Sequence, residues 1–116
     1  MSTIRDVSLA PLGKKRIEWV KDFMPVLSEI REQFIREQPF KGMRISVCVH
    51  LEAKTAYLGL VLRDGGAEVS ITGSNPLSTK DDICAALAEE GMDVHAFFGA
   101  NEDEYYEHIR RVLEFK

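Results

Sequence analysis

Residues 44–49 have the sequence Arg-Ile-Ser-Val-Cys-Val, and this short apolar, β-branched stretch decides the fold. It follows Gly42 and has the composition of a strand in a sheet. The spacing of the apolar residues then changes, because residues 55–62 carry the pattern of a helix that Gly65 and Gly66 would end. A strand that leads at once into a helix is typical of the first half of a parallel β-α-β unit.

The order of a strand followed by a helix occurs twice more along the chain. The pattern predicts strands at residues 67–72 and 93–98, a helix at 79–90, and a last helix from residue 101. Alternation at this spacing implies right-handed crossovers and a parallel sheet covered by helices. We therefore predict an α/β fold: a three-layer, Rossmann-like (flavodoxin-like) parallel sheet of about three strands. Because such sheets usually continue further, we expect an incomplete domain.

Residues 1–39 have a different pattern. After an irregular first dozen residues, apolar side chains recur every three or four positions, which predicts a helix. Pro25 predicts a break in that helix near Phe23-Met24, because proline removes a backbone donor. We therefore divide the chain into a helical lead-in, 1–39, and strand–helix repeats, 40–116.

Length and charge narrow the functional classes. The 116 residues suffice for one domain, and 15 basic against 19 acidic side chains give a formal net charge of −4. A general nucleic-acid binder normally carries a basic surface, so we expect no nucleic-acid partner. No apolar run approaches the roughly 20 residues that span a bilayer, and two cysteines are too few for a disulfide framework. We expect no membrane partner and a cytoplasmic location.

Polar side chains follow the first predicted strand, where ligands bind in open α/β sheets. His50 comes directly after that strand, and a neutral imidazole there could bond a hydroxyl group or relay a proton. It could equally serve only to close the strand end. Glu52, Lys54 and Thr55 open the following helix, where solvated charge and helix capping account for their spacing without a ligand.

A second polar group follows the second predicted strand. It consists of Asn75, Ser78, Thr79 and Asp81. Asn75 precedes a proline and is typical of a turn, while Ser78 or Thr79 could cap the helix that follows, with Asp81 in its first turn. Asn101 and Glu104 have the spacing of a capping box for the last helix.

The sequence argues against a zinc site, the common nucleotide-binding motifs and a response-regulator receiver. Cys48-Val49-His50 lacks a second ligand pair at zinc spacing, so we expect no metal. His95 is isolated, and a packing or surface role is its simpler interpretation. Neither GxGxxG nor GxxxxGK[ST] occurs. A flavodoxin-like response-regulator receiver is disfavoured, because no acidic cluster closes the first strand.

Taken together, the motifs resemble the N-terminal part of the adenosylhomocysteinase (S-adenosylhomocysteine hydrolase) family. The landmarks are Ile4-Arg5-Asp6-Val7-Ser8-Leu9-Ala10, Met24-Pro25-Val26-Leu27, Pro39-Phe40-Lys41-Gly42, His50-Leu51-Glu52-Ala53-Lys54-Thr55-Ala56, Gly66-Ala67-Glu68-Val69, Asn75-Pro76-Leu77-Ser78-Thr79-Lys80-Asp81-Asp82 and Glu104-Tyr105. The stretches that begin at His50 and at Asn75 are the most specific of these, in this order and spacing.

The resemblance implies an NAD-dependent enzyme that reversibly splits S-adenosylhomocysteine into adenosine and homocysteine. By the family pattern, His50 is the candidate catalytic residue, placed at the ribose to assist proton transfer. Residues 52–55, with Glu52, Lys54 and Thr55, would lie beside the purine. The second polar group, Asn75, Ser78, Thr79 and Asp81, would border the same cleft.

Two departures from the family pattern matter. Many members carry Thr at the position of Glu52 and Glu or Gln at that of Lys54. Lysine only donates hydrogen bonds, so it suits the 6-oxo group of hypoxanthine better than the amino group of adenine. We therefore hypothesise that the complete enzyme accepts S-inosylhomocysteine. The competing interpretation is that Lys54 turns outward and backbone groups contact the base.

The second departure is that the family's NAD-binding domain, with its glycine fingerprint, has no counterpart in residues 1–116. We expect NAD in the full-length enzyme and no cofactor on this segment, which should be inactive alone as the N-terminal portion of a substrate-binding domain. Expected partners are a nucleoside substrate and the remainder of the parent chain or a partner subunit, in a homo-oligomer when complete. The alternative is a stand-alone, non-catalytic module derived from the family.

Overall fold

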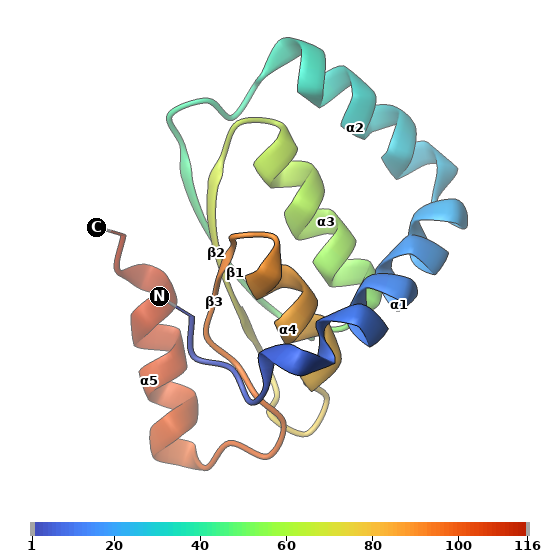
Figure 1. The fold of residues 1–116 in the computed structure, drawn as a ribbon. Helices are drawn as coiled ribbons and strands as arrows, with labels where there is room; N and C mark the ends of the chain where they lie inside the picture. The colour runs from blue at the N-terminus through green and yellow to red at the C-terminus, as the bar shows by residue number, and fades with distance from the viewer. Residues whose placement is uncertain (1, 116) are drawn as a thin grey trace.

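A computed structural model of the chain describes residues 2–115 and confirms the α/β prediction (Figure 1). Three parallel strands lie in the order in which they occur in the sequence: β1 (Arg44–Val49), β2 (Glu68–Gly73) and β3 (Asp93–Val94). Each strand leads into a helix, and these are α3 (Ala53–Asp64), α4 (Asp81–Glu89) and α5 (Glu102–Leu113). Met1 and Lys116, which the predicted division of the chain includes, lie outside the described residues.

Helices cover both faces of the sheet, which makes the fold three-layered. Figure 1 shows α3 and α4 on one face and α5 on the other. The Ser46 hydroxyl of β1 donates to the carbonyl of Val112 in α5 at 2.5 Å, which ties that helix to its face. β1 lies at one edge of the sheet, and β2 is the central strand.

The core lies between the sheet and helices α3 and α4, and α1 adds Ile17 and Val20 to it. Every residue of β2 after Glu68 is buried, and so are residues 82–87 of α4. Helix α1 (Ala10–Asp22) crosses α4 so closely that a Cβ atom on Gly13 would lie 1.9 Å from the carbonyl oxygen of Asp82. Only glycine permits this approach.

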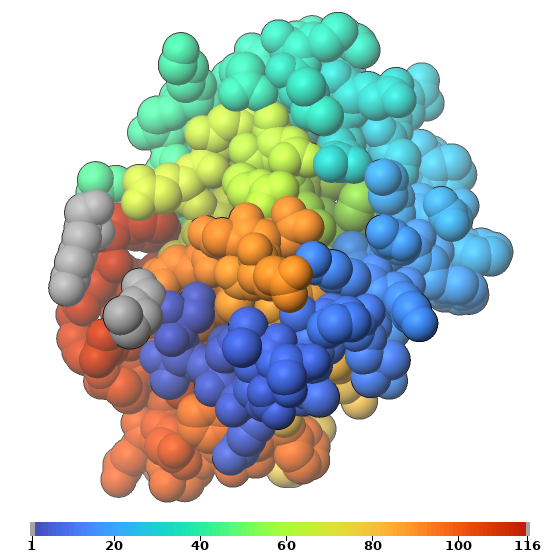
Figure 2. Space-filling view, viewed as in Figure 1, coloured from blue at the N-terminus to red at the C-terminus, as the bar shows by residue number. Residues whose placement is uncertain are grey.

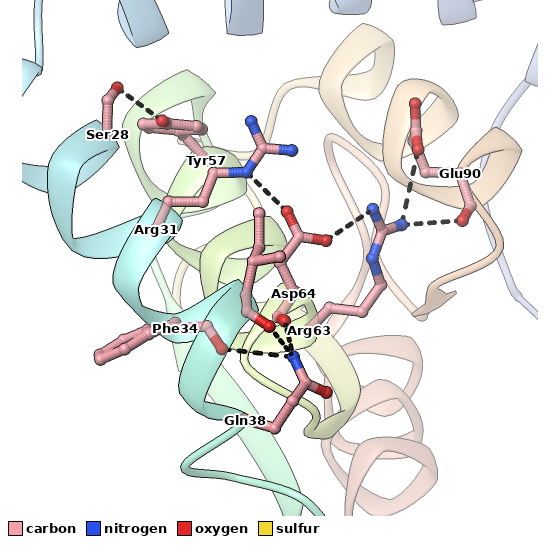
Figure 3. Close-up of polar contacts among 9 residues, drawn as sticks. Ser28, Arg31, Phe34, Gln38, Tyr57, Arg63, Asp64 and Glu90 are labelled. Atoms are coloured by element: carbon pink, nitrogen blue, oxygen red, sulfur yellow. Dashed lines mark hydrogen bonds and ion pairs between the residues drawn. The ribbon is translucent and has the colours of Figure 1, made fainter.

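Helix α2 (Pro25–Glu37) is held on the outside of α3 by polar contacts instead of deep burial (Figure 3). No residue within α2 is fully buried. Arg31 Nε donates to Asp64 Oδ2 at 2.6 Å, and the Ser28 and Tyr57 hydroxyls lie 2.7 Å apart. Gln38, just beyond the helix, donates to the Asp64 carbonyl at 2.7 Å. These contacts fix α2 against the second turn and the C-terminal end of α3.

The lead-in confirms one prediction and corrects another. The helix breaks at residues 23–24, as predicted, and Pro25 begins α2, where a first-turn proline costs no hydrogen bond. The prediction of an irregular first dozen residues holds for residues 2–6 and is wrong from Val7 onward. A short 3-10 helix (Val7–Leu9) leads directly into α1, because Asp6 Oδ1 accepts from Ser8 N at 2.9 Å.

The third strand is shorter than predicted. Regular pairing with β2 covers Asp93–Val94, and His95 then pairs with Thr3 in an isolated parallel bridge. The backbone N–H of His95 still donates to the Ile71 carbonyl at 3.0 Å, and further along the chain Phe98 N donates to the Asp81 carboxylate at 2.8 Å. Gly99, at a φ of +76°, then turns the chain toward α5.

Of the two predicted helix caps, one is confirmed and one is wrong. Asn101 and Glu104 form the predicted capping box, with bonds of 2.8 and 3.0 Å. Neither Ser78 nor Thr79 caps α4, whose N-cap is Lys80 and has no side-chain bond. The two hydroxyl groups instead donate to the backbone carbonyl of Asn75.

Candidate functional site

The candidate site lies at the edge of the sheet where β1 and β2 both end. Val49 and Gly73 are the last residues of the two strands and stand opposite each other in the register. Ser74 N donates to the Val49 carbonyl at 3.0 Å, and Lys80 N donates to the carbonyl of the fully buried Leu51 at 3.1 Å. These bonds place the two predicted polar stretches side by side.

His50 is the first residue after β1, and its ring is exposed. Its Nδ1 atom lies 2.7 Å from the Ser78 hydroxyl oxygen, which in turn donates to the Asn75 carbonyl at 3.1 Å. The structure thus joins His50 to two of the residues predicted after the second strand. An exposed imidazole anchored through one nitrogen has the other ring edge available to a ligand.

Glu52 is the N-cap of α3. Its carboxylate accepts from Thr55 N at 3.2 Å and from Thr55 Oγ1 at 3.4 Å, so capping accounts for the side chains of both residues. Lys54 stands between them in the first turn of the helix, and it is exposed. Contact of these three residues with a ligand stays a prediction.

Thr79 and Asp81 face inward. Thr79 is only 2% exposed and lies so close to Gly73 that a Cβ atom there would be 2.6 Å from its hydroxyl oxygen. Asp81 bonds the Phe98 backbone, and its second carboxylate oxygen lies 4.0 Å from Arg5 Nε. Both residues fix the shape of this edge, and their contact with a ligand also stays a prediction.

Sequence reasoning missed a buried polar cluster around His95. This ring is 2% exposed, with Nδ1 at 2.9 Å from the Thr3 hydroxyl and Nε2 at 2.9 Å from Asp93 Oδ1. The Ser70 hydroxyl donates to the other Asp93 oxygen at 2.9 Å. Burial opposes ionisation of Asp93, but the bonds from Ser70 and His95 outweigh it and lower the pKa of the carboxyl group. The i, i+2 spacing of Asp93 and His95 was the signal, since it puts both on one face of a strand.

A cavity of about 440 Å³ lies at the opposite end of the strands. Glu68, Asp93 and Arg111 are among the residues that line it, and they bring charges of both signs. No polar residue predicted at the site lines this cavity.

The chemistry of the described residues limits what the site can hold. Among residues 2–115, no group of three or more His, Cys, Asp or Glu side chains could hold a metal ion. No helix in this part of the chain is long and apolar enough to cross a membrane. The turns before α3 and α4, residues 50–52 and 74–80, contain no glycine. They therefore do not fit NAD, whose pyrophosphate needs close backbone approach at a helix N-terminus.

Comparison with known proteins gives one family. The model of the family described as S-adenosyl-L-homocysteine hydrolase matches residues 1–116. The chain is 53% identical over 113 residues to an adenosylhomocysteinase of Pyrococcus abyssi, a match that covers 97% of the chain and 27% of that protein. It is 58% identical over 110 residues to an S-inosyl-L-homocysteine hydrolase of Methanopyrus kandleri, covering 95% and 26%. It is 52% identical over 116 residues to an S-inosyl-L-homocysteine hydrolase of Methanocaldococcus jannaschii, covering 100% and 28%. The chain thus spans about a quarter of the length of these curated relatives.

Proposed function

The chain belongs to the S-adenosyl-L-homocysteine hydrolase family, and on this premise we propose that it forms the first part of the substrate-binding domain of a hydrolase that cleaves nucleosyl-homocysteine thioethers. The observation that carries the proposal is the position of His50, exposed at the carboxyl end of β1 and held there by Ser78. The names of the relatives support a thioether hydrolase. The remainder of a longer parent chain would supply the other wall of the site, in a homo-oligomer.

The topology of the sheet supports this location. Helices α3 and α4 lie on one face of the sheet, where α3 connects β1 to β2 and α4 connects β2 to β3 (Figure 1). Helix α5 lies on the other face, against β1 and β2. A right-handed crossover through α5 would therefore place a further parallel strand beside β1. The strand order would reverse at β1, and ligands of open α/β sheets bind at such a reversal, beyond the carboxyl ends of the strands. His50 occupies that point.

The residues of the edge take different roles in this proposal. His50 holds or moves a proton at the ribose, and Lys54 and Thr55 lie beside the base. Asn75 and Ser78 border the ribose side of the same site, while Glu52, Thr79 and Asp81 shape it through the contacts described above. NAD, which the turns before α3 and α4 do not fit, would be held elsewhere in the parent protein and would supply the redox chemistry.

The base of the nucleoside is either adenine or hypoxanthine, since relatives with both names match the chain. Lys54 favours hypoxanthine, because its ammonium group only donates and the 6-oxo group only accepts. S-inosylhomocysteine is therefore the second candidate substrate beside S-adenosylhomocysteine.

Turnover of the complete parent protein tests the proposal. The purified protein would be supplied with S-adenosylhomocysteine and, separately, with S-inosylhomocysteine, and the released homocysteine would be measured by its thiol. We expect release from at least one conjugate. A folded parent protein that releases homocysteine from neither would contradict the proposal.

A further inference from the structure

The Ser78 hydroxyl group makes two contacts that constrain each other. Its oxygen lies 2.7 Å from His50 Nδ1 and 3.1 Å from the backbone carbonyl oxygen of Asn75. A hydroxyl group has one proton to donate, and a carbonyl oxygen can only accept. When Ser78 donates to Asn75, its oxygen has only lone pairs left for the ring of His50.

We propose that Ser78 is a positioning residue that holds neutral His50 in the tautomer with the proton on Nδ1, so that Nε2 presents a lone pair at the carboxyl edge of the sheet. The tautomer follows from the hydrogen bonds alone, and its use as a base at the ribose rests on the proposed function. In a neutral imidazole one nitrogen donates and the other accepts, so the bond at Nδ1 decides the chemistry at Nε2.

The opposite arrangement replaces one hydrogen bond with a contact between two acceptors. If Ser78 donated its proton to Nδ1, its oxygen would lie 3.1 Å from the Asn75 carbonyl oxygen with no proton between them, and that carbonyl would accept only from Ser78 N and Thr79 Oγ1. Nε2 would then carry the proton and would donate to a ligand instead of accepting from it. The proposed tautomer is the one in which both contacts are hydrogen bonds.

The hydroxyl group is also placed before any ligand arrives. Ser78 N donates to the same Asn75 carbonyl at 3.1 Å, and Asn75 Oδ1 accepts from Leu77 N at 2.9 Å. Lys80 N then bonds the Leu51 carbonyl at 3.1 Å, which ties the segment to the turn that carries His50. Because these bonds fix the backbone on both sides, the Ser78 side chain has little freedom to choose another partner.

Nitrogen NMR of the side chains tests the tautomer directly. The complete protein would be labelled with ¹⁵N-histidine, with His50 assigned through His50→Gln, at a pH where the ring is neutral. We expect a protonated-type shift for Nδ1 and an unprotonated-type shift for Nε2 of His50. Ser78→Ala should move both shifts toward a mixture of tautomers, and Ser78→Thr, which keeps a hydroxyl group, should restore them.

Thr79→Val is the matched control, because Thr79 also donates to the Asn75 carbonyl at 3.1 Å but does not bond to His50. It should leave the His50 shifts unchanged. A wild-type His50 with the proton on Nε2, or shifts that Ser78→Ala does not move, would overturn the inference.

Turnover of the complete protein separates this inference from the proposed function. Ser78→Ala should lower kcat about tenfold, a fraction of what an acid–base group contributes, with KM changed far less. If the tautomer is as proposed but His50→Gln leaves turnover intact, the proposed function fails and the tautomer stands. If His50→Gln abolishes turnover but Ser78→Ala moves neither the shifts nor kcat, only the role of Ser78 fails.

Discussion

His50 and His95 each come directly after a parallel strand, yet the structure gives them opposite environments. His50 is exposed and bonded through Nδ1 to Ser78, whereas His95 is 2% exposed and has a partner at each nitrogen. A ring whose two nitrogens are both occupied and buried serves to hold the structure together. A ring with one accessible nitrogen can act on a ligand.

The difference comes from what covers each strand. The N-terminal segment lies across β3, with Thr3 N donating to the Val94 carbonyl at 2.8 Å and Ala96 N to the Thr3 carbonyl at 3.0 Å. Figure 2 shows this segment, in dark blue, packed between the orange and red parts of the chain. β1 lies at the opposite edge of the sheet, and His50 beyond its end is exposed. The carboxyl edge at β1 is therefore open, and the β3 side is closed.

The largest expected effect is on turnover at the open edge. His50→Asn in the complete protein should lower kcat by roughly 10²–10⁴-fold, the usual contribution of a general acid or base. The free energy of unfolding should change by less than about 0.5 kcal/mol, because the ring is exposed. Steady-state kinetics and urea unfolding of the same preparation measure the two effects. If His50→Asn lowered the free energy of unfolding but preserved turnover, His50 would have the structural role assigned to His95, and the contrast between the two residues would fail.

The next effect is on stability at the closed side. His95→Ala removes the bonds to Thr3 and Asp93 and leaves a cavity, so the free energy of unfolding should fall by about 2–3 kcal/mol. Urea unfolding would show this as a lower midpoint, with His50→Ala as the matched control that keeps the wild-type midpoint. Equal midpoints for the two variants would contradict the assignment.

A smaller effect is expected on the pH dependence of stability. The pKa of Asp93 is lower in the folded chain than the unfolded value of about 3.9, so its stabilisation is present above that value and is lost as the pH falls through the folded pKa. Ser70→Ala removes one cause of the lowered pKa and should cost about 1 kcal/mol at neutral pH. Unfolding measured between about pH 2 and 7 should show the wild type and this variant converging in acid. A constant difference across that range would exclude Asp93 as the source.

The smallest expected effect concerns the base of the nucleoside. Lys54 is exposed, so Lys54→Gln should shift the ratio of kcat/KM for S-inosylhomocysteine over S-adenosylhomocysteine by only about threefold toward the adenosyl compound. Competition between the two conjugates in one reaction measures the ratio. An adenosyl preference in the wild type that persists unchanged in Lys54→Gln would show that Lys54 does not contact the base.

Local sequence patterns predicted the elements whose causes are local. β1, the break before Pro25 and the capping box at Asn101 each depend on residues within a few positions of one another. The predicted parallel strands also placed His50 and Ser78 at one edge of the sheet, because parallel strands end at the same side of a sheet.

Two features that the sequence did not reveal depend on contacts between distant residues. The chain beyond β3 is held by the bond from Phe98 N to Asp81, and Thr3, 92 residues away from His95, pairs beside that buried ring. The Ser78 and Thr79 hydroxyl groups donate to the Asn75 carbonyl instead of accepting from the first N–H groups of α4, and only the turn geometry decides between those two partners. No periodicity in the sequence marks any of these contacts.

A crystal structure of the complete protein with its bound nucleoside would examine the open edge most directly. We expect His50 Nε2 within hydrogen-bonding distance of the ribose and the base beside the first turn of α3, where Lys54 and Thr55 lie. A nucleoside seated instead in the 440 Å³ cavity at the other end of the strands, near Glu68 and Asp93, would contradict the account.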